Sequence, residues 1–236
     1  MGVSNTKRNV ILSILFFLPV AFIIIMLTSN ENYNPLDVVK ENIVELPVTK
    51  DSIQLKNHIT VLSFLGKQPM DNSIVALNLK ELIYDRCKGF KTFQVVVMLP
   101  HQAKEQAEKL LKEIKSYEDL RFWHFVYADE FQIKNVFKSL KSDVTLNENL
   151  ATNSVYIIDK ELNQRGRLDN RTDDEKVNKK PVYGLYDYDC ISIDELKNKM
   201  SGEDMRILFT EYRDKRVGKF EGSTTRRGKD LKQIDE

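Results

Sequence analysis

Few residues in this chain could carry redox, metal or nucleophilic chemistry. Its 236 residues include two cysteines and three histidines, and these do not form the closely spaced pairs typical of ligands. Glycine-rich phosphate loops, nucleophile elbows and metalloprotease His-Glu pairs are also missing. The formal net charge is +1, so bulk charge does not indicate nucleic-acid binding. We therefore expect no cofactor, no metal and no nucleic-acid partner.

An uncharged stretch near the N-terminus, "NVILSILFFLPVAFIIIMLTSN", is the longest apolar run. Its length suits a helix that crosses a hydrocarbon core about 30 Å thick, and Pro19 is tolerated in a membrane helix. A cleaved signal peptide is the alternative, although the apolar part of such a peptide usually has only about 7–15 residues. The run therefore predicts a transmembrane anchor over residues 10–29.

The charges around this run predict its orientation. Lys7 and Arg8 precede it, whereas Glu31 and Asp37 follow it. The positive-inside rule then keeps residues 1–9 in the cytoplasm. We expect a single-pass protein of the inner (cytoplasmic) membrane, with its C-terminal part on the periplasmic or extracytoplasmic side.

The rest of the chain divides by composition into three parts. Residues 30–50 are polar with short apolar islands, which predicts a stalk. Residues 51–217 contain the apolar runs of a folded domain, and residues 218–236 have so few apolar residues that we expect a disordered tail.

Strands and helices alternate in the expected domain. Continuous apolar runs indicate buried strands at 59–65, 93–99 and 122–127. Three- and four-residue apolar spacing predicts helices over 73–88, 102–116 and 133–140. A hairpin over 153–168 follows, and a helix begins at a capping box formed by Ser192 and Glu195. This order predicts an α/β fold, with a thioredoxin-like central sheet flanked by helices and preceded by one transmembrane helix.

Three segments in this order carry a resemblance to a known family. They are "VLSFLGKQPMDN", "VVVMLPHQAKEQAEKLLKEIKSYEDLRFWHFVYAD" and "NSVYIIDKELNQRGRLD". They resemble the cysteine loop, the strand–helix–strand unit and the penultimate hairpin of the Sco family. Sco proteins are membrane-anchored, have a thioredoxin fold and assist cytochrome c oxidase assembly. The resemblance covers about residues 55–215 and implies a role in respiratory oxidase biogenesis.

The chain departs from the family at each copper ligand. The two cysteines of the family's Cys-Pro-x-x-Cys loop fall at Gln68 and Asn72, its histidine falls at Ala151, and Pro69 is retained. Copper(I) prefers thiolates, thioethers and imidazole, and thiol–disulfide exchange requires a thiolate. The departures therefore predict that copper delivery and dithiol reduction are lost.

Two cysteines outside this loop keep an alternative open. Cys87 and Cys190 could pair in an oxidising compartment or remain two isolated buried thiols. A copper-binding or thiol-redox protein that uses Cys87 or Cys190 is therefore an alternative function. We expect Met70 to pack rather than to bind metal and His124 to be half-buried on the sheet, and we interpret "YDYD", 186–189, as a solvated turn.

The sequence favours a membrane-anchored, non-catalytic accessory that binds oxidase subunits or copper-delivery factors. A structural envelope module unrelated to respiration is a further alternative. We expect the partner-contact face to combine the hairpin exit 165–170 with the loop that replaces the cysteine site. The residues assigned to this face are Gly66, Lys67, Gln68, Pro69, Met70, Asp71, Asn72, Arg165 and Arg167.

Overall fold

The computed structural model describes residues 5–28, 35–48, 52–115 and 120–218. They belong to two units, an N-terminal one and a folded domain that begins at Pro35, and each unit is described by itself. The tail predicted over 218–236 lies outside the described residues except for Gly218.

The N-terminal unit contains a single described helix, α1 (Asn5–Thr28), with Pro19 inside it. Its window Lys7–Ile24 has a mean hydropathy of 1.9, and no part of that window is buried within the protein. A helix of this length extends for about 36 Å. By length and composition, α1 could therefore cross a bilayer.

The folded domain is built on one mixed sheet with the order β1-β6-β5-β2-β3-β4. Strands β2, β3 and β4 run parallel, whereas β5 and β6 are antiparallel to their neighbours. A short strand, β7 (Tyr188–Asp189), pairs with β5. The strands are β1 (Asp37–Lys40), β2 (Ile59–Phe64), β3 (Phe93–Pro100), β4 (Trp123–Ala128), β5 (Ser154–Ile158) and β6 (Gln164–Gly166).

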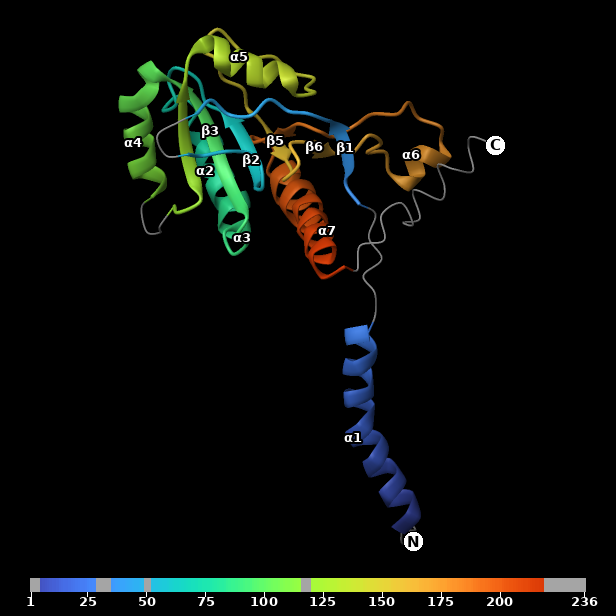
Figure 1. Cartoon of the computed structure of the whole chain (residues 1–236). Coiled ribbons are helices and arrows are strands. Elements are labelled where there is room, and N and C mark those ends of the chain that lie inside the picture. Colours follow the sequence, from blue (N-terminus) through green and yellow to red (C-terminus); the bar gives the residue numbers. More distant parts are fainter. Residues whose placement is uncertain (1–4, 29–34, 49–51, 116–119, 219–236) are drawn as a thin grey trace. The chain divides into compact units, whose positions relative to one another are not determined.

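This order confirms the predicted thioredoxin-like sheet. The first βαβ unit places β2 beside β3, and the later hairpin adds β5 and β6 on the other side of β2. Figure 1 shows these strands side by side, with helices above and below them. The helices are α2 (Ser73–Leu79), α3 (Asp85–Cys87), α4 (Lys104–Ile114), α5 (Glu130–Ser139), α6 (Asp173–Val177) and α7 (Met205–Val217).

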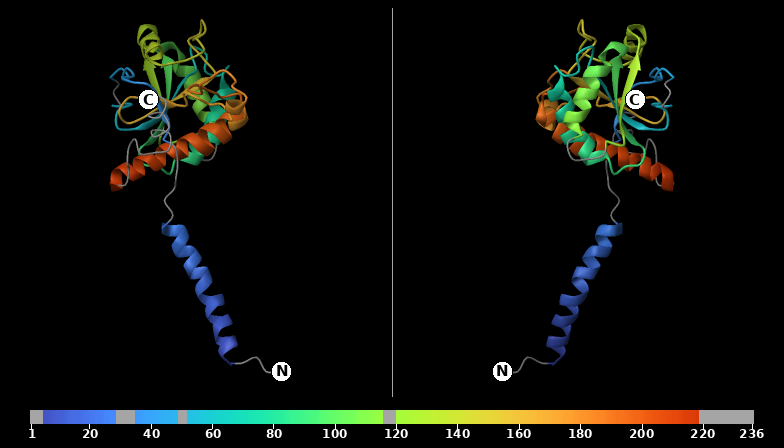
Figure 2. Two further views of the ribbon diagram at one scale, coloured as in Figure 1. Left: turned by 90° about the vertical axis from the view of Figure 1, so that its right-hand side faces the viewer. Right: turned by 90° about the vertical axis from the view of Figure 1, so that its left-hand side faces the viewer.

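Both faces of the sheet are covered. Residues of α2, α3, α4 and α7 form a core on one face, and residues of α5 with Ile43, Leu46 and Leu55 form a core on the other. Figure 2 shows α5 and α7 on opposite sides of the sheet. Val61 contributes to the first core and Leu62 to the second, because successive side chains of a strand point to opposite faces. This burial on both faces explains why the strands are continuous apolar runs.

The expected stalk over 30–50 needs a correction. Residues 35–48 belong to the folded domain, where β1 pairs antiparallel with β6 and the side chains of Leu36, Ile43 and Leu46 are buried. The apolar islands of this stretch are too short to indicate a strand by themselves. They become ordered because they pair with a strand that comes more than a hundred residues later in the chain.

The predicted capping box at Ser192 is half formed. The Ser192 hydroxyl accepts a hydrogen bond from the Glu195 amide at 3.4 Å. The Glu195 carboxylate, however, accepts from the Asp189 amide at 3.0 Å. This hydrogen bond thus joins the end of β7 to the helix that follows. That helix is a π-helical segment over Glu195–Asp204, and it continues into α7.

Candidate functional site

The loop between β2 and α2 takes a conformation that depends on Gly66. This residue has φ +74°, and a Cβ there would lie 2.3 Å from the Asn149 carbonyl oxygen. Glycine is the residue that adopts this backbone conformation without steric cost. The contact lets the Lys67 amide donate to the Asn149 carbonyl at 2.8 Å. Gly66 therefore holds the loop against the segment that precedes β5.

That segment is shaped by Asn147. Its side-chain oxygen accepts hydrogen bonds from the amides of Asn149 and Ala151 at 2.9 and 3.0 Å. Leu150, between these two, has φ +63°. Ala151 then forms an antiparallel bridge with Leu65. The side-chain bonds of Asn147 thus offset the strain of this turn and bring Ala151 against the loop.

A cavity of about 400 Å³ lies between the loop and this segment. Two of the three predicted family-ligand positions, Asn72 and Ala151, line it, whereas Gln68 is exposed and is not among the lining residues. The Asn72 side chain also donates to the Leu65 carbonyl at 3.0 Å. The full lining is Asn72, Val144, Thr145, Asn147, Ala151, Thr152, Asn153, Ser154 and Asp189.

The chemistry of this cavity is that of amides, hydroxyls and one carboxylate. None of the nine lining residues carries a thiol or an imidazole, and the described residues contain no cluster of three His, Cys, Asp or Glu side chains able to hold a metal. Neutral amides and hydroxyls form hydrogen bonds but supply neither a nucleophile nor a soft ligand. The cavity is therefore suited to binding rather than to thiol or copper chemistry.

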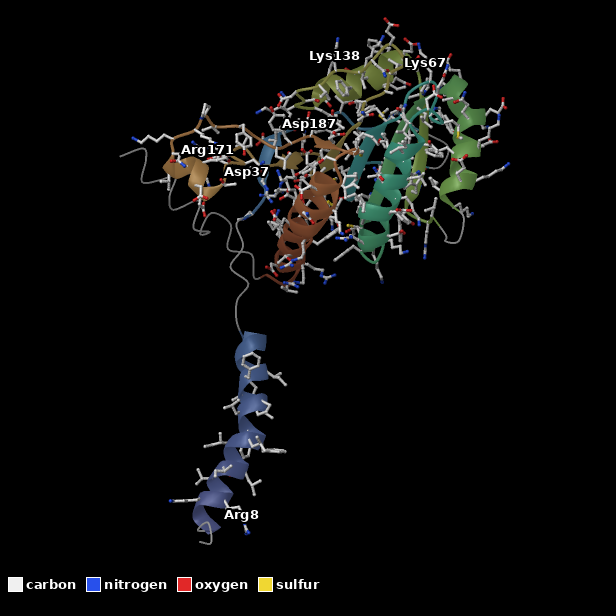
Figure 3. All side chains as sticks on the ribbon, turned by 180° about the vertical axis from the view of Figure 1, so that it is seen from behind. Arg8, Asp37, Lys67, Lys138, Arg171 and Asp187 are labelled. Carbon is white, nitrogen blue, oxygen red and sulfur yellow. The ribbon has the colours of Figure 1, made fainter. Side chains whose placement is uncertain are left out.

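The remaining loop residues differ in exposure. Gln68 and Asp71 are exposed, whereas Pro69 is buried and Met70 is partly buried. Met70 packs against the core of the first face, as predicted. Lys67 lies beside α5 (Figure 3), and its Nζ is 2.7 Å from the Glu130 carboxylate. A partner at this loop would therefore meet Gln68 and Asp71 first.

The two hairpin arginines do not belong to the expected contact face. Arg165 is only 4% exposed, and its guanidinium binds the carboxylates of Asp159 and Glu211 at 3.0 and 2.5 Å. Burial opposes its charge, but the two carboxylates outweigh burial and raise the pKa of Arg165. Arg165 also donates to the Leu36 carbonyl at 2.7 Å. We call Arg165, Asp159 and Glu211 the buried arginine cluster.

Arg167 is tied to the helix that precedes α7. Its Nε and Nη2 donate to Asp204 at 2.8 and 2.5 Å, and Nη2 also reaches Glu203. Asp204 is fully buried and accepts from the Tyr188 hydroxyl at 2.7 Å. Arg167, like Arg165, thus joins β6 to the C-terminal helices and does not line the cavity.

Both cysteines are buried and free. Burial raises the pKa of the Cys87 thiol to about 12 and also raises that of Cys190. Because thiol–disulfide exchange and copper binding use the thiolate, both thiols are poorly suited to either reaction. Of the two arrangements left open by the sequence, the described structure has the isolated buried thiols.

The histidines and the "YDYD" stretch also have defined positions. His124 is partly buried on β4, as predicted, and His101 is exposed. The interpretation of "YDYD" as a solvated turn is wrong for its tyrosines, because Tyr186 and Tyr188 are buried. Asp189, within β7, is exposed and lines the cavity. The sequence offered weak cation binding as a second interpretation of this stretch, but it did not indicate the pairing of Asp189 with Ser154, which is a long-range contact.

The domain resembles solved structures at low sequence identity and low TM-score. No protein-family model and no curated protein matches the chain by sequence. Solved structures that it resembles include copper-bound ScoI of Arabidopsis thaliana, with 14% identity over 66% of this chain and 92% of that one, and a TM-score of 0.39. The soluble domain of Sco1 from Bacillus subtilis has 12% identity over 75% and 96%, with a TM-score of 0.39.

Apo Sco1 from Thermus thermophilus is a further similar structure, with 12% identity over 78% of this chain and 95% of that one, and a TM-score of 0.40. Likeness at these identities and scores carries no argument about fold, family or function. The strand order and the placement of the helices in the domain itself define the architecture. The chain has a thioredoxin-like fold, and Sco proteins are among the solved structures that it is similar to.

Proposed function

We propose that the protein is a membrane-tethered, non-catalytic accessory that binds another protein at the end of the sheet where β2 meets α2. One observation carries the proposal. At the position where the resembled family has its cysteine loop, this chain keeps a shaped loop and a cavity, but the cavity is lined by Asn72 and Ala151. A site that retains its form without reactive groups is suited to recognition.

Non-catalytic action fits the state of the thiols. Cys87 and Cys190 are buried away from solvent, and their pKa values are raised. The groups that do face the cavity are amides, hydroxyls and a carboxylate. Binding through such groups needs no chemical step. The apolar helix α1 would serve as the membrane anchor that keeps this binding domain at a surface.

The respiratory oxidase is the first partner that we propose, because the sequence resemblance to Sco proteins motivates it. In this proposal the domain is extracytoplasmic and contacts an oxidase subunit or a copper-delivery factor. Binding to an oxidase subunit or a copper-delivery factor is a narrower proposal than binding to some other protein, so a test must distinguish these two cases.

Site-specific photo-crosslinking in native membranes distinguishes these two cases, because it identifies the bound partner. A photoreactive amino acid is placed in the full-length chain at Gln68, which is exposed in the loop, or at Lys138, an exposed control residue on α5. Figure 3 shows Lys67, next to Gln68 in the chain, and Lys138 at opposite ends of α5. We expect a discrete crosslinked protein from position 68 and none from position 138, with mass spectrometry identifying the product.

The outcomes are distinct. An oxidase subunit or a copper-delivery factor crosslinked from position 68 supports both parts of the proposal. A discrete partner of another kind keeps the accessory role and removes the oxidase assignment, as expected of an envelope module unrelated to respiration. Equal, diffuse labelling from both positions contradicts partner binding at the loop.

A further inference from the structure

The chain segments that supply the lining residues differ in charge from the rest of the molecule. The segments 65–74, 142–154 and 187–195 supply the lining residues. Together they contain seven acidic side chains and one basic one, Lys67, although the whole chain has a formal net charge of +1. The Lys67 ammonium is already paired with Glu130 at 2.7 Å. A cationic group would therefore be attracted to this end of the domain.

One carboxylate reaches the cavity itself. Among the described residues that line it, Asp189 is the single ionisable one. Its position is fixed because β7 pairs with β5 and its amide donates to Glu195 at 3.0 Å. One of its carboxylate oxygens accepts from the Ile191 amide at 2.9 Å. The surrounding amide and hydroxyl oxygens can accept further hydrogen bonds from an ammonium or guanidinium group.

Exposed apolar side chains belong to the same segments as the lining residues. We define the rim as Ile74, Val144, Ile191 and Ile193, which are 62%, 40%, 47% and 60% exposed. Val144 lines the cavity, Ile74 follows Asn72 by two residues, and the two isoleucines follow Asp189. The Asn78 side chain donates to the Cys190 carbonyl at 2.8 Å, which joins α2 to the segment with these isoleucines. Exposed apolar groups around a polar hollow are typical of protein-binding sites.

We propose that the partner presents a lysine or arginine side chain flanked by apolar residues. The cationic group enters the cavity and pairs with Asp189, while the flanking side chains contact the apolar rim. This inference rests on the proposed function, since it states which kind of protein segment the accessory recognises. Charge complementarity with Asp189 favours a basic side chain in the partner, and the apolar rim favours apolar residues on either side of it.

Peptide binding tests this recognition directly. The probes are fluorescent, N-acetylated peptides with a central Leu-Xaa-Leu, in which Xaa is arginine, lysine, glutamine or glutamate. A further peptide has Ser-Arg-Ser at its centre. Each is titrated by fluorescence anisotropy against the full-length chain in detergent micelles, against Asp189→Asn and against the control Asp173→Asn, which changes an exposed aspartate of α6.

We expect the arginine and lysine peptides to bind at least about tenfold more tightly than the glutamine and glutamate peptides, as a charge-assisted hydrogen bond implies. Asp189→Asn should remove this preference, and Asp173→Asn should preserve it. The Ser-Arg-Ser peptide should bind more weakly than its leucine counterpart, because it lacks contacts with the rim. Crosslinking from position 68 should also decrease in the Asp189→Asn protein.

Two results would overturn the inference. If the protein binds the four Leu-Xaa-Leu peptides equally and crosslinking from position 68 survives Asp189→Asn, the partner is recognised without a basic side chain. The proposed function then remains while the inference fails. Calcium binding that depends on Asp189, with no preference among peptides, would instead make the cavity an inorganic cation site. Absence of a crosslink from the photoreactive residue at position 68 in the protein with native Asp189 contradicts the proposed function itself.

Discussion

The cavity and the buried arginine cluster are two polar regions of one domain, and they differ in how their polar groups are satisfied. In the cluster, Arg165 binds two carboxylates and a backbone carbonyl inside the protein. The polar residues that line the cavity form internal hydrogen bonds with backbone groups, as Asn72, Asn147 and Asp189 do, and they also border an open hollow. Buried charges need internal partners, whereas groups at an open hollow can bind an incoming ligand. The first region thus supports the fold, and the second is available for recognition.

The largest effect is expected from Arg165→Met. The change leaves buried Asp159 without its cation and leaves buried Glu211 with only the Lys215 ammonium, at 2.8 Å, and breaking a buried pair in this way costs about 3–5 kcal/mol. Chemical denaturation of the full-length chain in micelles measures the loss. Arg171→Met, which removes the partly exposed partner of Asp169, is the matched control and should have a much smaller effect. Equal losses of unfolding free energy in the two variants would contradict the distinction between the two regions.

Thiol reactivity provides a second test. With the pKa of Cys87 near 12, its thiolate fraction at pH 8 is about a thousandfold below that of a thiol with a pKa of 9. We expect neither native cysteine to react with iodoacetamide in the folded protein, and both to react in urea. The thiol introduced by Asn72→Cys should react readily in the folded state. Mass spectrometry counts the labels, and rapid native labelling of Cys87 or Cys190 would revive the redox alternative.

A smaller effect is expected from Gly66→Ala. The added Cβ meets the Asn149 carbonyl at 2.3 Å, and the backbone remains at positive φ, so strain of about 1–3 kcal/mol follows. Gly89→Ala is the control, because nothing lies within 4 Å of its Cβ position. Thermal unfolding should separate the two variants. Peptide binding by Gly66→Ala should weaken as well, because the loop forms one wall of the cavity.

The smallest effect on stability is expected from Asp189→Asn. The carboxylate is exposed, and an amide oxygen can replace it as acceptor for the Ile191 amide. We expect an unchanged unfolding midpoint within error together with a clear loss of basic-peptide binding. A strongly destabilised variant would show that Asp189, like the residues of the buried arginine cluster, stabilises the fold.

The sequence predicted the elements that depend on local pattern. The apolar runs of β2 and β3, the helices that follow them and the late hairpin were all found, because burial on both faces and helical spacing are visible in short windows. It missed β1 and the pairing of Asp189 with Ser154, because the partners in both cases are distant in the chain. It also assigned Arg165 to the surface, since a charged residue in a strand gives no sign of the two carboxylates that accompany it.

Two of the three predicted ligand positions proved informative about the site. Asn72 and Ala151 share the cavity, so alignment with the family's loop located a real hollow even though its chemistry differs. Gln68 did not join them because the turn at Gly66 leaves it exposed. The resemblance therefore indicated where the cavity lies, while most of the residues that line it had to come from the structure.

The bond from Arg165 to the Leu36 carbonyl has a mechanical consequence. Leu36 is the second residue of the folded domain, which follows the apolar helix in the chain. A pulling force transmitted from that helix would reach β1 first and would meet a strand both paired with β6 and fastened to a buried guanidinium. The domain should therefore resist extraction at this point.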